Sequence, residues 1–161
     1  MSRSFHLFWI AGFIGSAGGQ FTAVALPWLV LQMTGSATLV GTAFAVMAAP
    51  AAIMSLLGGA LADRYSPKAL MIAARLMACG AACILGVSVL MDAASLPAIY
   101  AAGVLFSLSE ATAMPAGFAL APRLMPPEQY KRGNALMMGS AQLANIGGPG
   151  AAGMLLAALT L

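Results

Sequence analysis

The stretch GGALADRYSPK, residues 58–68, separates two long apolar runs and carries three charged residues, Asp63, Arg64 and Lys68. The whole chain has only 7 basic and 4 acidic residues among 161, so this concentration is unusual. Asp63 would stand at the C-terminal end of a helix, which is the negative pole of the helix dipole, so it needs positive neighbours. Arg64, Lys68 and Arg75 are the basic residues nearest to it in sequence. Since Gly59 lets another helix approach closely, we interpret the stretch as a charged latch between two helices.

The composition excludes a soluble globular protein. Hydrophobic residues make up 61% of the chain, charged residues 7%, and the mean hydropathy is +0.94. About a quarter of the residues in soluble domains are charged. A helix needs about 20 apolar residues to cross a bilayer, so the chain has room for about five or six spans. The few basic residues form no aromatic-interleaved stripe, which argues against a nucleic-acid partner.

Five apolar runs predict an all-α integral membrane protein, because only helices satisfy the backbone of such segments in lipid. The expected spans cover residues 5–31, 39–62, 69–91, 97–120 and 135–160. Cys79 and Cys83, four residues apart in the third run, are expected to be small buried hydrophobes.

The basic residues predict the orientation of these spans. All seven fall on one side if the five runs cross the bilayer alternately: Arg3, Arg64, Lys68, Arg75, Arg123, Lys131 and Arg132. By the positive-inside rule, the N-terminus and the segment around Asp63 are cytoplasmic. An odd number of spans then puts the C-terminus at the outer face.

The stretch from Gly59 to Lys68 resembles the cytoplasmic motif between the second and third helices of the major facilitator superfamily. Gly59, Leu61, Asp63, Arg64 and Lys68 match that motif, whereas Ser66 and Pro67 stand where Gly and Arg are usual. Ser as N-cap followed by Pro at the first helical position favours the start of a helix there.

Three further stretches are similar to exporters of this superfamily. The segment ALPWLVLQMTGSATLVG, residues 25–41, resembles the first and second helices of macrolide, drug and siderophore exporters. Residues 133–136 resemble the entry to the fifth helix of that branch, and GPGAAG, residues 148–153, resembles its antiporter motif with Ala152 as a departure. Gly19 stands where an acid is frequent, and the fourth run holds no clear match to the arginine motif of proton-coupled drug exporters.

This resemblance implies a secondary active transporter that exports a drug-like or siderophore-like small molecule by alternating access, with proton coupling left open. Residues 1–161 would form a partial N-terminal domain, five helices of a six-helix bundle, with the second half absent. The implied partners are the lipid bilayer, a small-molecule substrate, protons and the missing C-terminal half, and the implied location is the bacterial inner membrane. A nutrient-importing facilitator and a non-transporting five-span scaffold remain as alternatives.

Glu110, Gln20 and Asn145 are the candidate substrate or proton site. An acid at the centre of a membrane helix costs on the order of 2.5–3.5 kcal/mol, so Glu110 is expected to face a cavity or a partner. The resemblance implies that the first and fourth helices line a central cavity, which would bring Glu110 near Gln20. The alternative for all three residues is a structural hydrogen bond between helices.

Gly148, Pro149 and Gly153 form a candidate helix-bend motif, because Pro removes a backbone hydrogen bond and Gly offers no steric resistance. A static kink is the alternative. His6 is the only histidine, so neither a zinc pair nor a Ser-His-Asp set is available, and we expect no enzyme activity, catalytic residue, metal or cofactor.

Overall fold

Five long α-helices make up most of the computed structural model, which describes residues 3–91 and 93–159. Side chains at 58–63, 156–157 and 159 lie outside the described part. The helices are α1 (Arg3–Thr34), α2 (Ala37–Arg64), α3 (Pro67–Leu90), α4 (Leu96–Leu120) and α5 (Tyr130–Leu159), with two short 3₁₀ helices, η1 (Ala121–Leu124) and η2 (Pro127–Gln129), before α5. No strand occurs among the described residues, and the all-helical prediction is confirmed.

Four helices are long and apolar enough to cross a membrane, judged over the residues described: Arg3–Thr34, Ala37–Leu57, Pro67–Leu90 and Leu96–Leu124. α5 is the least hydrophobic of the five long helices, since Gln142, Asn145 and a glycine-proline run lie within it. The fifth span therefore stays a prediction, as does the cytoplasmic N-terminus.

Local sequence signals explain where the helices begin and end. Gly35 adopts a positive φ of 63° and donates its N–H to the Leu31 carbonyl at 2.8 Å, which ends α1 in a conformation that glycine adopts without strain. Ser66 is the N-cap of α3 with Pro67 at its first position, as the sequence predicted. The Ser66 side chain makes no capping hydrogen bond, so Pro67 is the clearer start signal.

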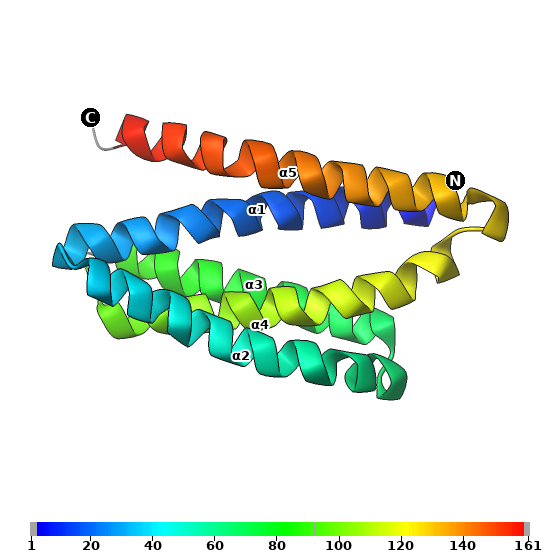
Figure 1. The fold of residues 1–161 in the computed structure, drawn as a ribbon, viewed down its shortest axis with the longest axis horizontal. Helices are drawn as coiled ribbons and strands as arrows, with labels where there is room; N and C mark the ends of the chain where they lie inside the picture. Colours follow the sequence, from blue (N-terminus) through cyan, green and yellow to red (C-terminus); the bar gives the residue numbers. More distant parts are fainter. Residues whose placement is uncertain (1–2, 92, 160–161) are drawn as a thin grey trace. The chain divides into compact units, whose positions relative to one another are not determined.

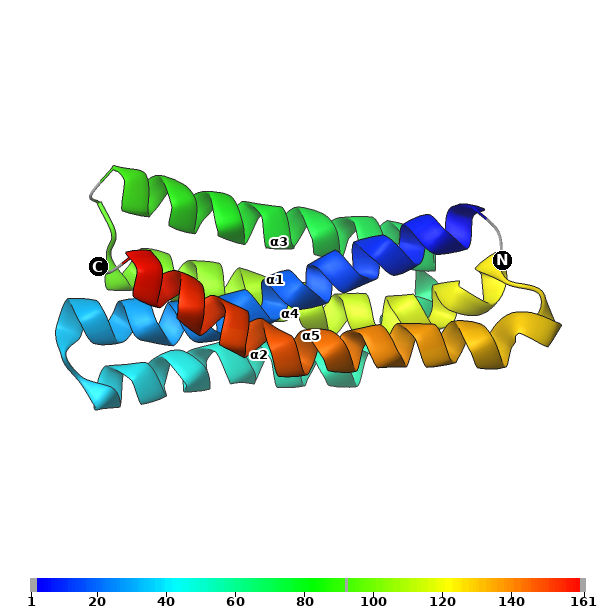
Figure 2. The same cartoon turned by 90° about the horizontal axis from the view of Figure 1, so that it is seen from above.

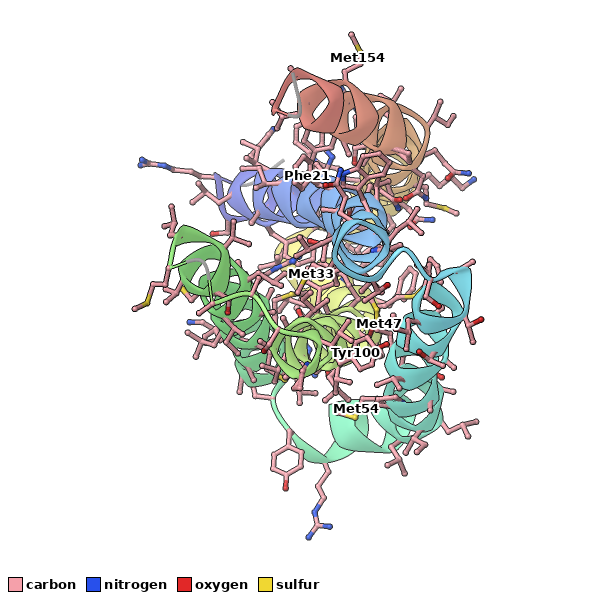
Figure 3. The ribbon with its side chains drawn as sticks, turned by 90° about the vertical axis from the view of Figure 1, so that its left-hand side faces the viewer. Phe21, Met33, Met47, Met54, Tyr100 and Met154 are labelled. Carbon is pink, nitrogen blue, oxygen red and sulfur yellow. The ribbon has the colours of Figure 1, made fainter. Side chains whose placement is uncertain are left out.

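The chain forms two compact units, and the first described here is the α2–α4 unit, residues Leu26–Leu120. α4 packs against both α2 and α3 and is the central helix of this unit (Figure 1). Its buried core consists of Leu26 and Val30 from the end of α1, Ala43 from α2 and Ile99 from α4. Figure 3 shows Met47 of α2 and Tyr100 of α4 directed into the space between their helices, where both pack against this core.

The second is the α1–α5 unit, Met1–Ala25 with Ala121–Leu161. Within it α1 and α5 run side by side (Figures 1 and 2). Trp9 bonds to Ser140 and Gln20 bonds to Asn145, so the two helices point in the same direction. Phe5, Ala121 and Met125 form the buried core at the start of both helices.

α5 begins at Tyr130, ahead of the expected span 135–160, because η2 leads directly into it and Lys131 and Arg132 lie in its first turn. The span itself stays a prediction. One expectation is wrong. Cys79 and Cys83 are free and exposed, not buried. The buried residues of α3 are Pro67, Ala74 and Ala81, seven residues apart on one face, and the cysteines lie away from that face.

Candidate functional site

Arg75 of α3 and Glu110 of α4 form an ion pair inside the α2–α4 unit. Arg75 Nη1 lies 3.9 Å from Glu110 Oε1, and the two side chains are 32% and 44% exposed. Immediately beside the pair, Ser109 is fully buried and its hydroxyl donates to the Ala74 carbonyl at 2.7 Å. Two adjacent residues of α4 thus contact two adjacent residues of α3, which fixes the register between these helices.

This pairing gives Arg75 a partner that the sequence did not name. Arg75 was assigned to the latch around Asp63, whereas the structure places it against Glu110. Arg64 and Lys68 are exposed. The surroundings of Gly59 and the side chain of Asp63 lie outside the described part of the structure. The latch therefore stays a prediction. The sequence shows Arg75 as a charged residue within the apolar run of α3, but it does not show that Glu110 of α4 is its partner.

Gln20 and Asn145, both candidates from the sequence, contact each other in the α1–α5 unit. Gln20 Nε2 donates to Asn145 Oδ1 at 2.5 Å, and Asn145 Nδ2 donates to Gln142 Oε1 at 3.1 Å. Gln142 was not among the candidate residues. Its spacing of three from Asn145 on one helix was the available signal, since residues at i and i+3 are neighbours on a helix surface. The three amides form a chain from α1 to α5.

Gly148 of α5 lies directly against Gln20. A Cβ built at Gly148 would lie 2.5 Å from Gln20 Cβ and 3.0 Å from its Cγ, so only glycine fits without a shift. Gly153, in contrast, has nothing within 4 Å of such an atom. α5 continues as an α-helix through Pro149 to Leu159. Of the bend motif, Gly148 has a defined packing role.

Trp9 supplies a contact between α1 and α5 that the sequence did not reveal. Its indole N–H donates to Ser140 Oγ at 3.0 Å and to the Leu136 carbonyl at 3.3 Å, and Ser140 in turn donates to the Met137 carbonyl at 3.0 Å. A tryptophan in an apolar run gives no sign of which helix accepts its N–H. This contact and the amide chain hold the two helices at separate points along their length.

Glu110 belongs to the α2–α4 unit and Gln20 to the α1–α5 unit. Their expected closeness around one cavity therefore stays a prediction. Among the described residues, no group of three or more His, Cys, Asp or Glu side chains could hold a metal ion.

Comparison with known proteins identifies the family. The model of the Major Facilitator Superfamily matches residues 8–160. The enterobactin exporter EntS of Shigella boydii serotype 4 (strain Sb227) is 30% identical over 155 residues, which cover 96% of this chain and 37% of that protein. EntS of Salmonella typhimurium (strain LT2) is 31% identical over the same coverage.

The chain spans 37% of the length of these curated relatives. No solved structure matches it. The family and these relatives are transporters, not enzymes. With several apolar helices and such relatives, this chain is a multi-pass protein of the bacterial inner membrane. The match over nearly the whole chain, together with helices of membrane-spanning length, shows that this chain belongs to the Major Facilitator Superfamily.

Proposed function

We propose that this chain is the N-terminal part of a secondary active transporter that exports a siderophore-like or drug-like small molecule. The observation that carries this proposal is the similarity to enterobactin exporters over 96% of the chain. The resemblance of residues 25–41 to macrolide, drug and siderophore exporters supports the same branch of the family. The five-span topology with a cytoplasmic N-terminus is part of the proposal.

Polar side chains within the apolar helices would recognise the substrate. Amide and charged groups are costly at membrane depth, and they are found there chiefly where they line a cavity or pair with each other. The chain of Gln20, Asn145 and Gln142 joins α1 to α5 and offers amide donors and acceptors to a polar ligand. Its hydrogen bonds account for only part of the capacity of three amides, which leaves groups to bind substrate.

Alternating access would use the loop motif and the packing of α5. In such transporters two halves rock around a site near the middle of the bilayer. Gly59, Asp63, Arg64 and Lys68 would latch one conformation on the cytoplasmic side. Gly148 allows α5 to approach Gln20 closely, so a movement of α5 would change the amide chain directly. A second half, outside this sequence, would complete the transport path.

Proton coupling would act through Glu110. When its carboxylate is charged, it attracts the Arg75 guanidinium 3.9 Å away. Protonation removes that attraction and frees Arg75, so the α3–α4 contact would differ between the two protonation states. Proton entry could then drive the change of conformation that export requires.

The test is an export assay on the full-length transporter in a bacterium that lacks its own siderophore exporter. We expect a catecholate siderophore to accumulate in the medium, and a protonophore to reduce that accumulation. Asp63→Asn is expected to reduce export at equal protein level. Uptake of a nutrient without any export would favour the importing facilitator instead, and transport of neither class would favour the scaffold.

A further inference from the structure

The net charge of the chain lies entirely in the α1–α5 unit. Four of the 7 basic residues and one of the 4 acidic residues belong to this unit, so its formal charge is +3, equal to that of the whole chain. The remaining three basic and three acidic residues balance in the α2–α4 unit. A general preference for basic residues on one side of a membrane would not by itself concentrate the excess in one unit.

The four basic residues of the unit lie at one end of it. Arg3 begins α1, Arg123 is in η1, and Lys131 and Arg132 are in the first turn of α5. Figure 1 shows the start of α1, marked N, at the same end as the segment that leads into α5. All four side chains are exposed. We call these residues the basic end.

Defined packing holds the basic end together. Phe5 of α1 is buried against Ala121 and Met125, which brings the start of α1 to η1. The Tyr130 hydroxyl donates to the Pro122 carbonyl at 3.1 Å, which ties the residue before Arg123 to the residue before Lys131. A Cβ at Gly133 would collide with Met125, so the first turn of α5 packs closely on this segment. The basic side chains are therefore gathered by the fold and not only by sequence.

Two helix N-termini add to the positive potential of the basic end. α1 begins at Arg3 and α5 at Tyr130, and the N-terminus of a helix carries a partial positive charge. The one acidic residue of the unit, Glu128, lies in η2 and offsets only part of this charge. Tyr130 is exposed and Trp9 is half-buried, and such aromatic residues are enriched at the boundary between lipid and water.

We propose that the basic end binds the phosphate headgroups of anionic phospholipids, such as phosphatidylglycerol, at the membrane surface. Exposed Arg and Lys side chains at the ends of long apolar helices lie where headgroups are found. Each basic residue near an anionic surface contributes about 1 kcal/mol to binding, which is about a fivefold change in affinity. The proposal is independent of which substrate the transporter moves.

The experiment titrates the full-length transporter in neutral detergent with short-chain phosphatidylglycerol or with phosphatidylcholine of the same chain length. Tryptophan fluorescence of Trp9, in a background where Trp28 and every tryptophan of the second half are replaced by Phe, reports binding near the basic end. We expect phosphatidylglycerol to bind more tightly, and 1 M salt to reduce the difference because it screens exposed charges. The double variant Lys131→Gln/Arg132→Gln should bind phosphatidylglycerol about 25-fold more weakly, and adding Arg123→Gln should weaken it further.

The matched control is Arg64→Gln/Lys68→Gln, which removes one Arg and one Lys from the α2–α4 unit. It should weaken phosphatidylglycerol binding by less than about fivefold, since the three acidic residues of that unit balance its three basic residues. Equal weakening in both double variants would overturn the proposal. So would equal binding of the two lipids, which is expected if an acidic segment of the same transporter already covers the basic end. Displacement of the lipid by millimolar glycerol phosphate would also overturn it, because the site would then recognise free phosphate.

Discussion

Arg75 of α3 and Glu110 of α4 face each other across 3.9 Å, next to the buried hydrogen bond from Ser109 to the Ala74 carbonyl. This arrangement neutralises two charges within otherwise apolar helices. It also joins a residue that the sequence assigned to a loop motif with one that it assigned to a substrate or proton site. The first two predictions concern this pair.

Arg75→Gln and Glu110→Gln should each lower the free energy of unfolding, because each leaves the other charge without its partner. The double variant should recover part of the loss, with a coupling of about 1 kcal/mol between the two positions. A double-mutant cycle from denaturant unfolding in detergent measures this coupling. Lys68→Gln combined with Glu110→Gln is the control and should be additive. A coupling below about 0.3 kcal/mol for the Arg75 pair would mean that the ion pair contributes nothing.

Glu110→Gln should also remove the pH dependence of export by the full-length transporter, because the amide cannot exchange a proton in this range. Glu110→Asp keeps an ionisable group and should retain a pH dependence. Initial export rates in membrane vesicles, measured at several pH values with equal protein levels, check both variants. If Glu110→Gln exports normally with an unchanged pH profile, Glu110 does not couple transport to protons.

Gly148→Ala should destabilise the protein by about 1–3 kcal/mol, since its new methyl group would overlap Gln20 Cβ and neither backbone can yield easily. Gly147→Ala is the matched control, because nothing lies within 4 Å of a Cβ at that position. The control should be neutral or stabilise α5 by up to about 1 kcal/mol, the helix propensity gained over glycine. Thermal unfolding in detergent compares the two. Equal midpoints would show that the contact with Gln20 is not as close as described.

Ser109→Ala should cost about 0.6 kcal/mol or more, because it removes an interhelical hydrogen bond at a fully buried position. Ser88→Ala provides the comparison, since the Ser88 hydroxyl donates to the Ile84 carbonyl of its own helix. Removing that bond breaks no contact between helices, so the free energy of unfolding should change little. The free energies of unfolding of the two variants decide whether Ser109 ties α4 to α3.

Asn145→Leu separates a substrate role of the amide chain from a structural one. If Asn145 contacts substrate, the variant should raise the KM for export several-fold, in addition to any loss of stability. If the chain only joins helices, the loss of its hydrogen bond to Gln20 should lower stability by about 0.6 kcal/mol while KM is unchanged. Leu143→Ala, a change at an exposed apolar residue two positions away, controls for general effects on α5.

Several features of this protein could be read from residues close together in the chain. Gly35 ends one helix and Pro67 begins another through their own backbone preferences, and the start at Pro67 was expected. The pairing of Gln20 with Asn145 could not be read this way, because 125 positions separate them and either amide could have found another partner. Gln142 lies only three positions from Asn145, but its place in the amide chain appears only when Asn145 is seen bonded to both Gln20 and Gln142.

The sequence by itself determined that the chain is a helical membrane protein with its family motifs in place. Hydropathy, helix length and turn residues act locally, and long apolar segments of this kind satisfy their backbone hydrogen bonds in a bilayer by forming helices. Only the tertiary structure decided which polar groups meet. Arg75 of α3 pairs with Glu110 of α4 because these two helices pack together, with Ala74 and Ala81 among the buried residues of α3. A uniformly apolar helix has no local sequence pattern that distinguishes its inward face. Packing against the neighbouring helices decides which face turns inward.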